Sequence, residues 1–129
     1  MRGTRAYSGV DLYTGVGRTL NIEAGVIQSD EPCMEEGLPI FSPGLIDLQV
    51  NGYGGHDLND GDLSAGKVEA LSEALCRVGI AAYFPTLITA NEPNICQRLS
   101  AIQEATERLP YSRQMIAGIH IEGLSLIHI

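Results

Sequence analysis

The apolar and polar positions of the C-terminal two thirds of the chain alternate between strand and helix patterns. The runs 45–51, 80–88 and 115–122 predict strands, because short apolar segments bounded by Gly or Pro are typical of them. The segments 64–78 and 91–109 carry apolar residues at helical spacing. Strand–helix–strand order at a spacing of roughly 35 residues predicts βαβ units on a parallel sheet.

Both predicted helices have recognisable ends. Ser64 or Asp62 is a suitable N-cap for the first helix, and Gly79 stands where a C-terminal stop is expected. The second helix should begin near 91–93 and end at Pro110. The residues expected on the buried faces are Val68, Leu71, Leu75, Val78, Ile95, Leu99, Ile102 and Leu109.

The N-terminal third of the chain has a different pattern of apolar and polar residues. Short apolar runs at 10–13, 19–22 and 25–27 are separated by Gly, Ser and Asp, which predicts short strands joined by turns. About 40 residues are too few to bury a stable core alone. We therefore expect a small β unit here and not a complete domain.

His120 and Glu122 stand at the end of the third predicted strand. Side chains alternate along a strand, so these two should project to the same side. That end of a parallel strand is where ligands bind in α/β folds. Imidazole and carboxylate suit zinc, but a catalytic zinc takes three protein ligands, and the other histidines are His56 and His128. A contribution to a metal site and an internal His–Glu pair both remain open.

Gln49 and Asn51 show the same alternation on the first predicted strand. Two amides on one side can orient a water or a carboxylate, but they are poor metal ligands. The loop at 52–61 lacks the G-x-G-x-x-G spacing of a dinucleotide site. Its acidic residues do not form a calcium loop either, because Val68 occupies the position of the bidentate Glu. The glycines are expected to let the backbone turn sharply.

The composition restricts the partners and the compartment. The formal charge of −8 argues against nucleic acid and anionic membranes, which select clustered Lys and Arg. Three scattered cysteines suit free thiols in a reducing cytosol, with Cys76 and Cys96 expected as buried residues on helices. No secretory signal or long apolar span is visible, so we expect a soluble cytoplasmic protein.

Three segments resemble a known family when they are taken together. In order and spacing, 43–55, 85–89 and 118–123 are similar to the first three strand motifs of N-acetylglucosamine-6-phosphate deacetylases, a branch of the amidohydrolase superfamily. The resemblance implies an α/β protein with a partial (β/α)8 TIM barrel of about three βα units, preceded by part of a small β-sandwich. The domains expected from it are 1–42 for the sandwich strands and 43–123 for the first βαβαβ portion of the barrel.

The resemblance also implies a function and a site. The family removes the acetyl group of N-acetylglucosamine 6-phosphate, giving glucosamine 6-phosphate and acetate. Glu122 matches its metal-ligating glutamate, His120 a supporting neighbour, and Gln49 and Asn51 the positions that hold H-x-H in many amidohydrolases. One divalent metal is implied, zinc or else iron, manganese or cobalt, incompletely ligated in this chain. Full-length members are expected to be homodimers.

The family's catalytic aspartate and two histidines come from later strands, so no catalytic or substrate-binding residue is assigned here. Residues 124–129 depart from the family pattern, which suggests a truncated or misassembled reading frame. We therefore expect these 129 residues to be inactive alone. Two alternatives stay open. One is a non-enzymatic short product that binds a partner or a sugar phosphate, and the other is a different hydrolase of the amidohydrolase superfamily.

Overall fold

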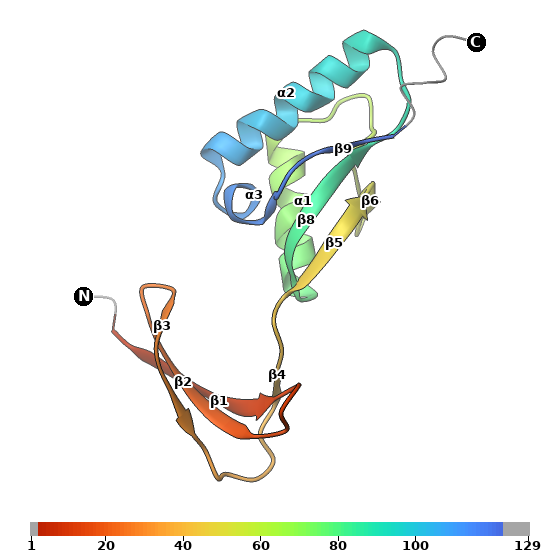
Figure 1. Cartoon of the computed structure of the whole chain (residues 1–129). Helices are drawn as coiled ribbons and strands as arrows, with labels where there is room; N and C mark the ends of the chain where they lie inside the picture. The colour runs from red at the N-terminus through yellow and green to blue at the C-terminus, as the bar shows by residue number, and fades with distance from the viewer. Residues whose placement is uncertain (1–2, 123–129) are drawn as a thin grey trace. The chain divides into compact units, whose positions relative to one another are not determined.

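The structure, a computed structural model, describes residues 3–122, and the chain divides into two compact units on either side of the Pro43–Gly44 peptide (Figure 1). The first unit is built from strands, and the second combines strands and helices. The protein is therefore of mixed α/β class, as expected. The predicted departure from the family at 124–129 lies outside the described residues.

The first unit is one four-stranded sheet in the order β3-β2-β1-β4. β1, β2 and β3 pair antiparallel, and β4 pairs parallel to β1. The strands are β1 (Arg5–Asp11), β2 (Gly17–Glu23), β3 (Val26–Pro32) and β4 (Ile40–Phe41).

The prediction of a strand at 10–13 is wrong in its extent. β1 starts five residues earlier, at Arg5, and ends at Asp11. The Asp11 carboxylate accepts hydrogen bonds from the backbone N–H groups of Tyr13 (3.1 Å) and Thr14 (2.7 Å). Such a bond from an aspartate to the backbone ahead closes a turn, which ends the strand despite the apolar residues that follow.

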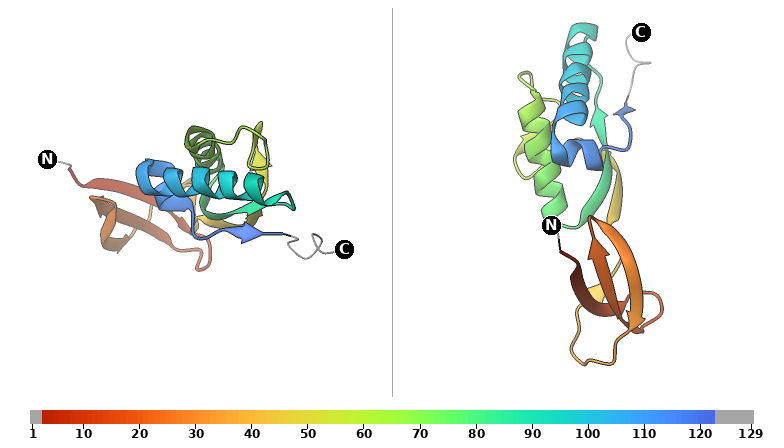
Figure 2. Two further views of the ribbon diagram at one scale, coloured as in Figure 1. Left: turned by 90° about the horizontal axis from the view of Figure 1, so that it is seen from above. Right: turned by 90° about the vertical axis from the view of Figure 1, so that its left-hand side faces the viewer.

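The second unit contains a parallel sheet in the order β5-β8-β9, and its helices lie on one face of that sheet (Figure 2). This confirms the predicted βαβαβ order. The elements are β5 (Leu45–Val50), the hairpin β6 (Gly52–Tyr53) and β7 (His56–Asp57), α1 (Ala65–Arg77), β8 (Ile80–Leu87), α2 (Glu92–Arg108), α3 (Pro110–Met115) and β9 (His120–Ile121).

The ends of α1 and α2 confirm the predictions from capping residues. The Ser64 side chain accepts from Lys67 N at 3.4 Å, and the Asn91 side chain accepts from Asn94 N at 3.0 Å. Gly79 follows α1 with φ +89°, a conformation that glycine adopts without strain. Side-chain caps satisfy backbone donors that have no partner inside the helix.

The helices and β8 enclose one hydrophobic core. Leu71, Leu87 and Ile102 are almost completely buried, and burial of each such side chain contributes roughly 2 kcal/mol. Seven of the eight predicted face positions are buried or pack against this core. Val78 is the exception at 51% exposed, because it is the C-cap of α1 and no longer follows the helical period.

Pro85 predicts an irregularity or an end of its strand, because it cannot donate to the sheet ladder. β8 continues through Pro85, but its register with β5 shifts at this point. Asp47 pairs with Tyr83 and Val50 pairs with Pro85, so three steps along β5 match two along β8. The predicted irregularity is confirmed and lies in the pairing of the strand.

The third strand is shorter than the predicted segment 115–122. Met115 ends α3, a helix that the sequence pattern does not predict because Pro110 marks the end of the preceding helix. Pro110 also occupies the first turn of α3, where its missing N–H costs nothing. Regular pairing is confined to His120–Ile121, with one isolated bridge at Ile116.

Gly118 lies between that bridge and β9, and its backbone lies close to an aromatic ring. A Cβ added at Gly118 would lie 2.9 Å from the Phe84 side chain, so only glycine fits without movement. Ile119 beside it is 41% exposed. The prediction of a continuous strand over 115–122 is therefore wrong, and the segment is an irregular edge of the sheet.

The three cysteines are free thiols, as predicted. The expectation that Cys76 and Cys96 are buried is wrong, because both lie on exposed faces of their helices. Within the described residues, no helix is both long and apolar enough to cross a membrane.

A row of polar groups is buried between β8, α1 and α3. The Tyr83 hydroxyl lies 2.9 Å from Ser72 Oγ, and Ser72 Oγ lies 3.1 Å from Ser112 Oγ. Ser112 Oγ donates to a carboxylate oxygen of Glu69 at 2.7 Å. Tyr83, Ser72 and Ser112 are fully buried. The row therefore satisfies hydroxyls that would otherwise be costly to bury.

Glu69 also caps α3 from α1, 42 residues away in sequence. Its two oxygens accept from the backbone N–H groups of Tyr111 and Ser112, each at 2.9 Å. Burial raises the pKa of Glu69, but the hydrogen bonds from Ser112 and Tyr111 outweigh it and hold that pKa below its ordinary value of 4.5. The ionised carboxylate is therefore the stabilising form.

We expect Glu69→Gln to lower the free energy of unfolding by about 1 kcal/mol at neutral pH, because a neutral amide cannot accept all three bonds. The depressed pKa of Glu69 gives stability that is complete above pH 4.5 and is lost as the pH falls through the folded-state value. Urea unfolding between pH 7 and pH 3 measures both effects. Glu73→Gln, which removes an exposed pair with Arg77 on the same helix, is the matched control. An equal loss in both variants, or a loss independent of pH, would contradict the capping role.

Candidate functional site

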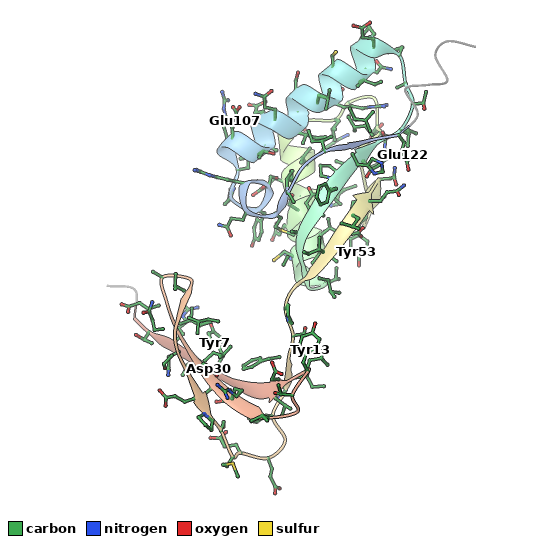
Figure 3. All side chains as sticks on the ribbon, in the orientation of Figure 1. Tyr7, Tyr13, Asp30, Tyr53, Glu107 and Glu122 are labelled. Atoms are coloured by element: carbon green, nitrogen blue, oxygen red, sulfur yellow. The ribbon has the colours of Figure 1, made fainter. Side chains whose placement is uncertain are left out.

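Gln49 and Glu122 meet at the C-terminal end of the parallel sheet. Gln49 Nε2 donates a hydrogen bond to Glu122 Oε1, joining the end of β5 to the residue that follows β9. Figure 3 shows the Glu122 side chain at the end of the sheet where the β5 arrow points. The contact crosses β8, which lies between the two strands. The structure thus brings together two of the four predicted site residues.

The backbone of Glu122 is tied to the end of β8. Glu122 N donates to Leu87 O at 2.8 Å, which continues the parallel ladder one step beyond β9. The Thr89 hydroxyl donates to Glu122 O at 3.3 Å. Both backbone polar groups of Glu122 therefore have partners, and the residue is held in position before its side chain makes any contact.

Asn59 fixes the loop between β7 and α1 to the same end of β8. Its side-chain amide donates to Thr86 O at 3.1 Å and accepts from Ile88 N at 2.9 Å. Its own carbonyl accepts from the guanidinium of Arg98, which is 7% exposed. The Asn59 side chain therefore makes the two kinds of hydrogen bond to the end of β8 that the backbone of a neighbouring strand would make. The sequence analysis missed this role, because nothing in the loop separates Asn59 from its polar neighbours.

His120 and Asn51 do not join the Gln49–Glu122 contact. His120 pairs with Thr86 in the parallel register, and the structure records no hydrogen bond of its side chain within residues 3–122. Asn51 lines a cavity of about 420 Å³ with Tyr53, His56 and Asp57 of the β6–β7 hairpin. Within residues 3–122, neither residue is therefore recorded in a hydrogen bond with the pair.

The described residues do not form a metal site by themselves. Within residues 3–122, no group of three or more His, Cys, Asp or Glu side chains is placed to hold one metal ion. A catalytic zinc normally takes three protein ligands. Glu122 provides one carboxylate, and its observed side-chain partner is an amide.

The chain is similar in sequence to two curated proteins. It is 39% identical over 83 residues to the N-acetylglucosamine-6-phosphate deacetylase of Haemophilus influenzae, and 31% identical over 86 residues to that of Bacillus subtilis. The matches cover 64% and 65% of this chain but only 21% of each relative. The chain therefore spans about a fifth of the length of these relatives. No family profile matches it.

A solved structure agrees with the sequence relatives. The crystal structure of N-acetylglucosamine-6-phosphate deacetylase from Pasteurella multocida superposes with a TM-score of 0.70 at 25% identity. The match covers 92% of this chain and 34% of the Pasteurella multocida chain. The resemblance carried by the three strand motifs is confirmed. Sequence and structure together show that this chain is similar to part of N-acetylglucosamine-6-phosphate deacetylases.

Proposed function

We propose that the chain is part of a deacetylase that hydrolyses N-acetylglucosamine 6-phosphate to glucosamine 6-phosphate and acetate. The observation that carries the proposal is the Gln49–Glu122 contact at the C-terminal end of a parallel sheet, where α/β enzymes place their sites. The names of the relatives supply the reaction class. The substrate and the reaction are proposed for this chain from its similarity to these relatives.

The proposal includes a more specific fold. Residues 43–123 would be the first βαβαβ portion of a (β/α)8 barrel, and 1–42 would contribute strands to a small β-sandwich. The parallel order β5-β8-β9 with helices on one face supports the barrel, because a barrel keeps its helices outside. A complete barrel takes about 250 residues, so the remaining strands would lie outside this chain.

Within this fold, Glu122 would be a metal ligand, with Gln49, Asn51 and His120 lining the site. The metal would be one divalent ion, zinc or else iron, manganese or cobalt, and its other ligands would come from later strands. A single carboxylate is too few ligands to hold zinc for catalysis, so we expect residues 3–122 not to form a hydrolytic centre by themselves. These residues provide one carboxylate, that of Glu122, in a fixed position.

The proposed setting follows from the substrate and the charge. The partner is a small amino-sugar phosphate, and the full-length protein is proposed to be a cytoplasmic homodimer. A formal charge of −8 supports neither a nucleic acid nor an anionic membrane as partner. The second candidate is a non-enzymatic short product that binds a partner or a sugar phosphate.

We expect the purified 129-residue chain to hold far less than one zinc per chain and to release no acetate from N-acetylglucosamine 6-phosphate, because it lacks a full ligand set. Metal analysis after dialysis and an acetate assay test both points. Calorimetric titration with the same sugar phosphate tests the second candidate. Stoichiometric metal together with turnover would refute the expectation of an inactive chain.

In a longer protein that carries these residues and the remaining strands, Glu122→Gln should lower kcat/KM by about a hundredfold or more. An amide is a weaker metal ligand than a carboxylate, and changes even to groups around metal ligands cost about 10–100-fold. Glu107→Gln is the matched control, because Glu107 is an exposed α2 carboxylate that also accepts from a glutamine amide. Unchanged turnover in Glu122→Gln would remove Glu122 from the site.

A further inference from the structure

We propose that Gln49 is a positioning residue that holds the Glu122 carboxylate by one oxygen and leaves Oε2 free to bind a cation. The inference rests on the proposed function, since it adds to the role of Glu122 as a ligand. It assigns a task to a side chain that cannot ligate a metal well itself. The basis is the bond from Gln49 Nε2 to Glu122 Oε1.

The contact spans two strand spacings. β5 and β9 are separated by β8, and neighbouring strands lie about 4.8 Å apart, so the two backbones are roughly 10 Å apart. Neither side chain covers that distance alone, so each must extend toward the other. The bond therefore selects one extended arrangement of Glu122 from the several that its side-chain rotations allow.

Both ends of the contact are anchored by their backbones. Gln49 N donates to the Asp47 carboxylate at 3.1 Å. Glu122 N donates to Leu87 O, and Glu122 O accepts from Thr89. With the backbone positions set, the main remaining freedom is rotation of the Glu122 side chain. Gln49 is the group that removes it.

The chemistry of the donor suits a carboxylate that must also bind a cation. An amide N–H is neutral, so it orients the carboxylate without cancelling its charge, whereas Lys or Arg would compete with a metal. No salt bridge of residues 3–122 involves Glu122. Within residues 3–122, its negative charge is therefore uncompensated, and its second carboxylate oxygen has no recorded hydrogen bond.

The first experiment uses NMR of the metal-free 129-residue chain. In the unchanged protein, we expect one dominant Glu122 rotamer from side-chain coupling constants, and a nuclear Overhauser contact between the Gln49 amide and Glu122. Gln49→Met keeps the length of the side chain and removes its hydrogen-bond donor. In this variant, the Glu122 coupling constants should take values averaged over several rotamers. Gln103→Met is the matched control, because it breaks an exposed amide–carboxylate bond of 2.8 Å to Glu107 on α2 and should leave Glu122 unchanged.

A reciprocal measurement keeps the proposal testable if Gln49→Met fails to fold. In Glu122→Ala, the Gln49 side-chain amide resonance should shift to the position of a free amide, while that of Gln103 stays in place. Gln49 is exposed, so Gln49→Met should keep the melting temperature of the unchanged chain. Single-rotamer couplings of Glu122 in folded Gln49→Met, or a Gln49 amide unaffected by Glu122→Ala, would overturn the proposal.

A second arm uses the longer protein and zinc alone. Gln49→Met should weaken zinc affinity by about 10–100-fold, the usual cost of losing a group that orients a metal ligand. Glu122→Gln should weaken it further. If Glu122→Gln leaves zinc affinity intact, the proposed ligand role fails, whereas the rotamer measurement still reports on Gln49. If only Gln49→Met leaves the affinity intact, the positioning role fails and the ligand role stands.

Discussion

The second unit depends on the buried row of hydroxyls in which Ser72 contacts both Tyr83 and Ser112. Burial raises the pKa of Tyr83 to about 12, so its hydroxyl remains a protonated donor at any physiological pH. The row joins the middle strand to two helices that are far apart in sequence. Apolar burial supplies most of the free energy, but it does not specify register. A buried hydroxyl has a partner in only one arrangement, so the row selects how α1 and α3 sit on β8.

The candidate site follows from that arrangement because β8 is the middle strand. Its carboxyl end carries the ladder contacts of Glu122 on one side, and its Thr86 carbonyl and Ile88 amide hold the Asn59 side chain. A shift of β8 would move both at once. Gln49 reaches across β8 and donates a hydrogen bond to the Glu122 carboxylate. The sheet is therefore the frame that fixes the position of this carboxylate. The same frame explains why one carboxylate can be placed here without a complete ligand set.

Local chemistry explains which features could be predicted from the sequence. Ser64, Asn91 and Gly79 mark helix ends through contacts with residues three or four positions away, and all three predictions are confirmed. The parallel order of the strands follows from the alternation of strand and helix patterns. Val78 shows the limit of the pattern, because a helical period says nothing about where the last turn unwinds.

The sequence by itself determined the family resemblance, the strand–helix alternation and the candidate carboxylate, because each depends on residue type and short spacing. Only the tertiary structure decided that β9 is two residues long, that Glu69 caps α3, and that Gln49 contacts Glu122. The last two features join residues 42 and 73 positions apart. No local pattern encodes such distances. They follow from the packing of α1 and α3 against β8, which brings distant side chains within hydrogen-bonding reach.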